Sequence, residues 1–160
     1  MRKLFAGLAI LLVLAVVAQF YFAASGAFST APNDESFRPH RALGYVIFLL
    51  AVLLTIVAAL ARMPGRLIGM AGLAAGLVVV QVVIAVLARA FNDTGDTSTT
   101  AGQLVFGLHA INGLAIMAAA GNVARQARTL SRSAVTDRPV GAGDGAEVSG
   151  PAARPAQPAS

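Results

Sequence analysis

The chain contains only two histidines, His40 and His109. His109 lies within residues 103–123, a mainly apolar run long enough to cross the roughly 30 Å hydrocarbon core of a bilayer as a helix. An ionisable side chain inside such a run is costly unless it faces a partner, a cavity or a cofactor. Imidazole is a common axial ligand of haem iron. The two histidines therefore predict a haem site, with noncovalently bound haem b as the cofactor.

A glutamine precedes each histidine, which makes the two halves of the chain alike. Gln19 lies in AVVAQFYFA and Gln81 in VVVQVVIA, while His40 opens HRALG and His109 opens HAING. Each half thus contains a glutamine, then a polar connection, and then the pattern His-x-x-x-Gly. We expect a duplicated helical hairpin with a pseudo-twofold axis along the membrane normal, as in parallel repeats of transporters. The alternative is chance similarity between aliphatic segments.

Residues close to the histidines complete the predicted site. Gly44 and Gly113 each lie four residues after a histidine, hence on the same helical face. A missing side chain there would leave room for a flat macrocycle, although such glycines also permit close helix packing. Asn112, three residues after His109, is placed to orient a neighbour by hydrogen bonding, as outer-shell partners of metal ligands do. It would equally serve to join two helices.

Two arginines flank the first histidine. Arg38 and Arg41 are placed to pair with haem propionates, because a guanidinium binds carboxylates through two parallel hydrogen bonds. Snorkelling of both side chains to the lipid headgroups is the alternative. The alternative for His109 is a hydrogen bond across helices, and for His40 a place at the start of an interfacial helix.

Composition excludes several other chemistries. The sequence is 57% hydrophobic and 12% charged, with a mean hydropathy of +0.74, which is typical of membrane proteins. It has no cysteine, so it forms no disulfide, thiolate metal site or thioether-linked haem. The net charge of +5 is spread over segment ends without the basic face that nucleic-acid binding requires. No catalytic residues are predicted, which favours a binding protein over an enzyme.

Four apolar runs set the expected fold. They cover about residues 4–24, 40–61, 67–88 and 103–123, and polar connections separate them. Short connections favour antiparallel neighbours, so we expect an all-α domain over residues 1–125, a four-transmembrane-helix up-down bundle. A cleavable signal peptide is the alternative for the first run. Residues 133–160 are rich in Ala, Gly, Pro and Ser and are predicted to be disordered.

Basic residues predict the orientation. Seven would lie on one side of the membrane and three on the other, and the richer side is cytoplasmic. The seven are Arg2, Lys3, Arg62, Arg66, Arg125, Arg128 and Arg132, against Arg38, Arg41 and Arg89. Both termini are therefore predicted in the cytoplasm.

The same basic residues predict the depth of each polar group. Gln19, Gln81 and His109 lie 15 or 16 residues from a cytoplasmic basic residue, but His40 lies 22 from Arg62. At helical rise His40 would then sit about 9 Å further out than the other three.

The run PHRALG at His40, together with Gln81 and the LHA at His109, resembles one four-helix half of a haem A synthase. The resemblance implies a haem-binding bundle with His40 and His109 as axial ligands. That family has an outer-loop glutamate where this chain has Phe37, and loop cysteines that this chain lacks. The oxygen-inserting activity is therefore not implied. The layout also resembles an uncharacterised group of small bacterial four-helix membrane proteins, which implies a bacterial plasma membrane.

The leading functional hypothesis is a b-type haem protein for electron transfer or haem handling. Its partners would be the lipid bilayer and a redox partner or membrane complex. One alternative is a structural or assembly subunit without a cofactor, and another is a small-molecule or quinone carrier.

Overall fold

The computed structural model describes residues 1–91 and 99–136, and within these it contains five helices and no strand. They are α1 (Arg2–Ala27), α2 (Asn33–Ser36), α3 (Arg38–Leu60), α4 (Gly65–Ala90) and α5 (Thr100–Thr136). All but α2 are long and apolar enough to cross a membrane. The all-α prediction is confirmed, and the chain has the architecture of a multi-pass membrane protein.

Three of the four expected apolar runs lie inside one long helix that extends beyond them, and the run 40–61 ends one residue after α3. The connection predicted over residues 25–39 contains α2, and Pro39 lies in the first turn of α3, where its missing N–H is not needed. Arg62 has a φ of 48° in the turn between α3 and α4, and Pro64 caps α4.

The fourth apolar run was predicted to end near residue 123, whereas α5 continues to Thr136. Residues 133–136, which were predicted to be disordered, therefore belong to α5. The extension is explained by good helix formers after residue 123 and by Ala127, which is buried in the core. Residues 137–160 lie outside the described part of the chain.

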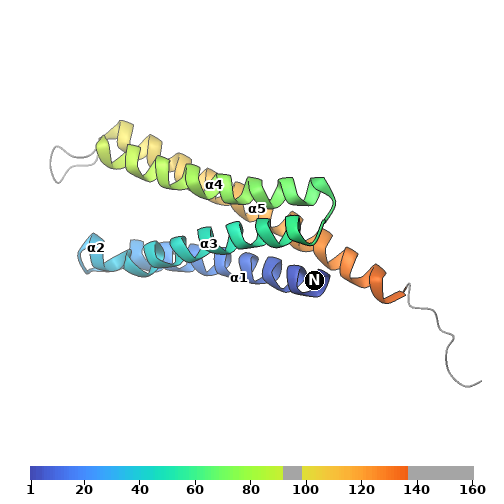
Figure 1. The fold of residues 1–160 in the computed structure, drawn as a ribbon. Coiled ribbons are helices and arrows are strands. Elements are labelled where there is room, and N and C mark those ends of the chain that lie inside the picture. The colour runs from blue at the N-terminus through green and yellow to red at the C-terminus, as the bar shows by residue number, and fades with distance from the viewer. Residues whose placement is uncertain (92–98, 137–160) are drawn as a thin grey trace, which may run out of the picture.

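The long helices form two antiparallel hairpins, α1 with α3 and α4 with α5 (Figure 1). In the described residues, backbone contacts join α1 to α3, α3 to α4, α4 to α5 and α5 to α1. The pairs α1–α4 and α3–α5 make no such contact, so they lie across the diagonals of a four-helix bundle. This arrangement places the two histidine-bearing helices diagonally opposite each other.

The buried core fills only one half of the bundle. It ends at Val16 on α1 and Val78 on α4, and it begins at Ile47 on α3 and Ile116 on α5. Alanines such as Ala51 are fully buried and let the helices approach closely. Beyond this core the two hairpins diverge toward the end that carries α2 (Figure 1).

The outer faces of the long helices are strongly apolar. Large side chains such as Leu49, Val82 and Leu114 are more than half exposed on them. A soluble monomer rarely exposes such continuous apolar surface. The hydrocarbon of a bilayer would cover it.

Candidate functional site

The polar side chains of the site lie immediately beyond the last core layer, at the same offsets in both halves of the chain. Gln19 follows Val16 by three residues, as Gln81 follows Val78. His40 precedes Ile47 by seven residues, as His109 precedes Ile116. The structure thus gives the predicted duplication a consistent register.

In the first half, Gln19 joins α1 to α3. Its Nε2 donates to the backbone oxygen of His40 at 2.9 Å and lies 3.3 Å from His40 Nε2. His40 Nδ1 lies 3.2 Å from the Gln19 carbonyl oxygen, which can only accept, so Nδ1 donates this hydrogen bond. Nε2 is therefore the ring nitrogen of His40 that is placed to bind a ligand.

In the second half, Gln81 joins α4 to α5 in the same way. Its Nε2 donates to the backbone oxygen of His109 at 2.8 Å. Asn112 Nδ2 donates to Gln81 Oε1 at 2.5 Å and to the Leu77 backbone oxygen at 2.8 Å. Asn112 thus holds the glutamine, and through it the backbone of His109.

The two halves of the chain differ in the hydrogen bonds of their histidine rings. His109 Nδ1 is buried and has no hydrogen-bond partner, and the same holds for Gln19 Oε1. A buried polar atom without a partner costs free energy and calls for an explanation, such as a bound ligand or water.

The histidine rings meet across the bundle. Their centroids are 6.1 Å apart and their planes are inclined by 47°. The offset of about 9 Å predicted for His40 is therefore wrong. The prediction assumed that all cytoplasmic arginines lie at one depth, whereas Arg62 follows the end of α3 in a turn that leads back into the bundle.

Two phenylalanines that the sequence analysis did not assign to the site accompany the rings. Phe106 stacks on His109, with centroids 5.2 Å apart and an interplanar angle of 5°. Phe37 meets His40 edge-on at 6.2 Å. Each precedes its histidine by three residues, so the repeat is Phe-x-x-His-x-x-x-Gly, a signal that was readable in the sequence.

The two glycines make room for neighbouring side chains. A Cβ on Gly44 would lie 3.5 Å from Gln19 Nε2. One on Gly113 would lie 3.4 Å from Phe20 Cζ and 3.8 Å from Gln81 Nε2. At these distances a Cβ would make ordinary van der Waals contacts, so each glycine lies directly beside the glutamine of its half.

The two predicted arginines differ in their partners. Arg41 forms an ion pair with Asp34 at 3.4 Å and donates a hydrogen bond to the Asp34 backbone oxygen, which ties α2 to α3. Arg38 is exposed at the start of α3 and Arg89 is exposed near the end of α4. Arg89 was not among the predicted site residues, although its place at the end of an apolar run was visible.

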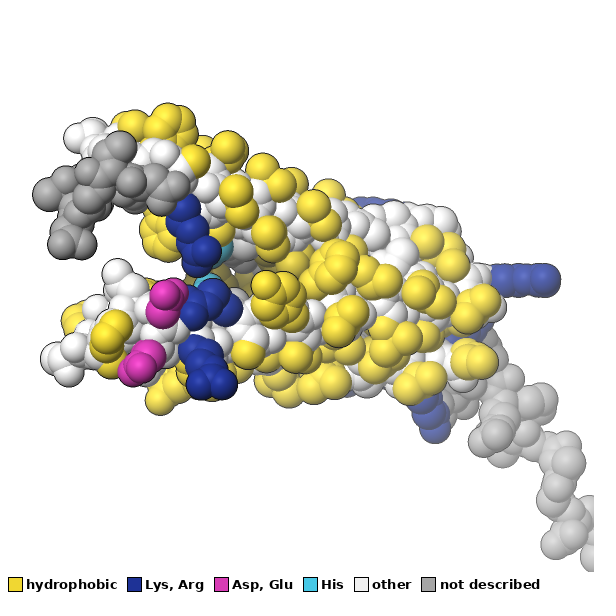
Figure 2. Space-filling model, turned by 60° about the vertical axis from the view of Figure 1, so that its left-hand side comes forward, with side chains coloured by type: hydrophobic (Ala, Val, Ile, Leu, Met, Phe, Trp, Pro, Cys, Tyr) yellow, Lys and Arg dark blue, Asp and Glu magenta, His cyan; other side chains and the backbone are white. Residues whose placement is uncertain are grey.

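A cleft between the two hairpins opens the site to the surface of the protein. Figure 2 shows this cleft at the end that carries α2, with the histidines at its base and Lys or Arg side chains of both hairpins along its walls. The basic residues of α3 and α4 at this end are Arg38, Arg41 and Arg89.

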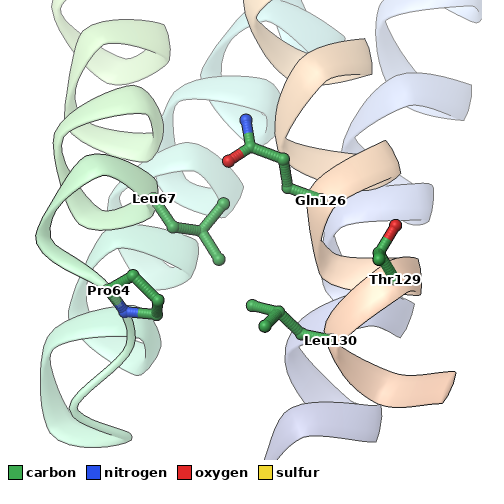
Figure 3. A pocket seen from close by; sticks show the side chains of 5 residues that line it. All are labelled: Pro64, Leu67, Gln126, Thr129 and Leu130. Atoms are coloured by element: carbon green, nitrogen blue, oxygen red, sulfur yellow. The ribbon is translucent and has the colours of Figure 1, made fainter. Parts of the chain in front are cut away.

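A separate cavity lies at the opposite end of the bundle, far from the histidines. It has a volume of about 250 Å³ and lies between the start of α4 and the extension of α5. Leu67 and Leu130 point toward each other across it, with Gln126 above them (Figure 3). It contains no group suited to metal ligation or acid–base chemistry.

The two histidine side chains at the cleft suit some metals better than others as ligands. In the described part of the chain, no three His, Cys, Asp or Glu side chains gather into one group. Zinc generally takes three or four protein ligands, so the histidine pair does not make a zinc site. A pair of imidazoles from opposite sides is the set that a six-coordinate haem iron takes from a protein.

The comparisons with known proteins do not assign a function. The model of a family of unknown function, DUF6220, matches residues 19–89, which is less than half of the chain. The match begins at Gln19 and includes His40, Gly44 and Gln81, but not the second histidine. No curated protein and no solved structure matches the sequence.

Proposed function

We propose that this membrane protein binds one b-type haem noncovalently at the base of the cleft, with His40 and His109 as axial ligands. The observation that carries the proposal is the distance between the rings. Two imidazoles on opposite sides of one metal ion, with metal–nitrogen bonds of about 2 Å, have centres roughly 6 Å apart. The His40 and His109 centroids are 6.1 Å apart and come from diagonally opposite helices.

The hydrogen bond from His40 Nδ1 supports the proposal. A metal-ligating histidine usually donates its other ring N–H to a carbonyl or carboxylate, which fixes the tautomer and the ring orientation. His40 makes such a bond from Nδ1 to the Gln19 carbonyl oxygen. Ligation would displace only the long 3.3 Å contact between Gln19 Nε2 and His40 Nε2, since the amide keeps its bond to the His40 backbone.

The surroundings also suit a flat, dianionic and largely apolar group. The cleft between the diverging hairpins lies at the histidines (Figure 2), and the rings of Phe37 and Phe106 contact them. Arg38 and Arg89 at its mouth are placed to pair with propionates, whereas Arg41 is already held by Asp34. Haem bound in this way would supply one-electron redox chemistry, and the chain's own residues would orient it and shield it from water.

Orientation is part of the proposal. We propose that both termini lie in the cytoplasm and the cleft near the outer face, because the excess of basic residues at the closed end of the bundle favours the cytoplasmic side. Electron transfer or haem handling at that face, with a redox partner or membrane complex, is the corresponding role. It would require no catalytic residue of the chain.

A second candidate is a structural or assembly subunit without a cofactor. The observation in its favour is that Gln19, Gln81 and Asn112 each form a hydrogen bond between helices. Such bonds alone would hold the two helices of each hairpin together. In that case the histidine rings would only be packed side chains.

Absorption spectra of the purified full-length protein, produced in cells supplied with haem, separate the candidates. We expect a low-spin spectrum with an α-band on reduction, and its loss in both His40→Ala and His109→Ala. Gln19→Leu and Gln81→Leu are the matched controls, because they change the same layer without removing a ligand. They should keep haem with a small shift of the band, as outer-shell changes do.

Two results would contradict ligation. A wild-type protein without haem would favour the structural subunit. Histidine variants that keep a low-spin spectrum would show that other side chains hold the haem. Haem retained in His40→Ala but lost in His109→Ala would show that His40 is not a ligand.

A further inference from the structure

A groove on the bundle surface, at the end opposite the cleft, combines apolar walls with two arginines. It runs between α1 and α5 and has a volume of about 200 Å³. Apolar or small residues form most of its lining, and Arg125 and Arg128 complete it. The apolar lining consists of Ile10, Val13, Leu14, Gly121 and Ala124.

Of the two arginines of the groove, Arg125 lies beside α1 well past the start of that helix. Arg125 lines the groove together with Ile10, which is eight residues past Arg2, where α1 begins. At helical rise this corresponds to about 12 Å of α1. A guanidinium at such a depth either reaches along the helix to the surface or is neutralised by an anionic partner.

The described residues at this end of the bundle supply no anionic partner. Asp34 and Glu35, the acidic residues of the described part, are on α2 at the other end. Arg125 donates to the Asn122 amide oxygen at 2.6 Å, which orients the guanidinium without neutralising it. The groove therefore has a positive end that favours a negative group from outside the chain.

The apolar part of the groove contains open space beside Gly121. A Cβ built on Gly121 meets nothing within 4 Å. The bundle therefore leaves space there without needing it for helix packing. An aliphatic chain lying along Val13 and Leu14 would fill this space.

We infer that the α1–α5 groove binds an anionic phospholipid. One acyl chain lies along the apolar walls at Gly121, and Arg125 and Arg128 hold the phosphate. Lipid is the source that fits both parts of the groove, since it carries the anion and the aliphatic chain in one molecule. Basic pockets between membrane helices bind anionic headgroups in this manner.

Native mass spectrometry of the delipidated full chain tests the inference. The protein would be incubated with equal amounts of phosphatidylglycerol and phosphatidylcholine of the same acyl chains. We expect one phosphatidylglycerol to be retained preferentially. Arg125→Gln/Arg128→Gln should weaken its binding about 30-fold, because each basic residue near the surface contributes roughly a fivefold gain.

Two further variants separate charge from shape. Arg62→Gln/Arg66→Gln makes the same change of charge at the same end of the bundle but outside the groove, so binding should stay unchanged. Gly121→Leu fills the groove with charge preserved and should also abolish the preference. Circular dichroism would establish that each variant keeps its helices.

Several outcomes would overturn the inference. They are equal retention of both lipids, equal loss in the two double variants, or full binding in Gly121→Leu. Displacement of the lipid by millimolar inorganic phosphate would show that the site recognises only the anion.

Discussion

The two glutamines of the site should contribute unequally to stability, although the repeat makes them look equivalent. Gln81 uses both ends of its amide, donating to the His109 backbone and accepting from Asn112. Gln19 uses only Nε2, and its Oε1 is buried without a partner. Replacement by leucine removes two hydrogen bonds at residue 81. At residue 19 it removes one hydrogen bond, the long 3.3 Å contact with His40 Nε2 and an unpaired buried oxygen, so the loss there is smaller.

The magnitude follows from the number of interhelical bonds. Polar contacts between membrane helices contribute about 0.6 kcal/mol each on average. Gln81→Leu removes two such contacts and should lower the free energy of unfolding by about 1.2 kcal/mol. Gln19→Leu should cost about 0.6 kcal/mol or less, because it also removes an unpaired buried oxygen.

Reversible unfolding in mixed micelles, titrated with dodecyl sulfate and followed by circular dichroism, measures both changes. Val80→Leu on the exposed side of α4 is the control and should stay within about 0.5 kcal/mol of wild type. A Gln19→Leu loss equal to or larger than that of Gln81→Leu would refute the reasoning. Additive effects of Gln81→Leu and Asn112→Leu would show that their 2.5 Å contact contributes nothing.

Two further predictions concern packing and topology. Gly26→Ala should lower the free energy of unfolding by about 1–3 kcal/mol, because a Cβ there would lie 2.9 Å from the Ser36 backbone oxygen. Gly69→Ala, in open space within α4, should instead raise it by about 0.5–1 kcal/mol in the same titration. Reporter domains fused after Thr30 and after Arg132 should read extracytoplasmic and cytoplasmic respectively. The opposite pattern would invert the proposed orientation and move the cleft to the cytoplasmic face.

The sequence by itself determined the helices and the composition of the site. Apolar runs of about 20 residues predict membrane spans, because helix formation inside a bilayer depends mainly on local hydrophobicity and on satisfying the backbone within the segment. The polar residues Gln19, His40, Gln81 and His109 stood out for the same reason, since each interrupts such a run or lies at its edge. The extent of α5 was underestimated, because its end outside the apolar run depends on helix propensity and on the packing of Ala127.

Only the tertiary structure decided how these residues meet. The relative depth of two helices depends on how their side chains interlock and how the connecting turn runs, which is why counting from Arg62 misplaced His40. The partners of Arg41, Gly44 and Gly113 lie on other segments, so no local pattern could reveal them. The diagonal placement of α3 and α5, which brings the two imidazoles together, is a property of the whole bundle, because it arises from which helix faces pack against each other.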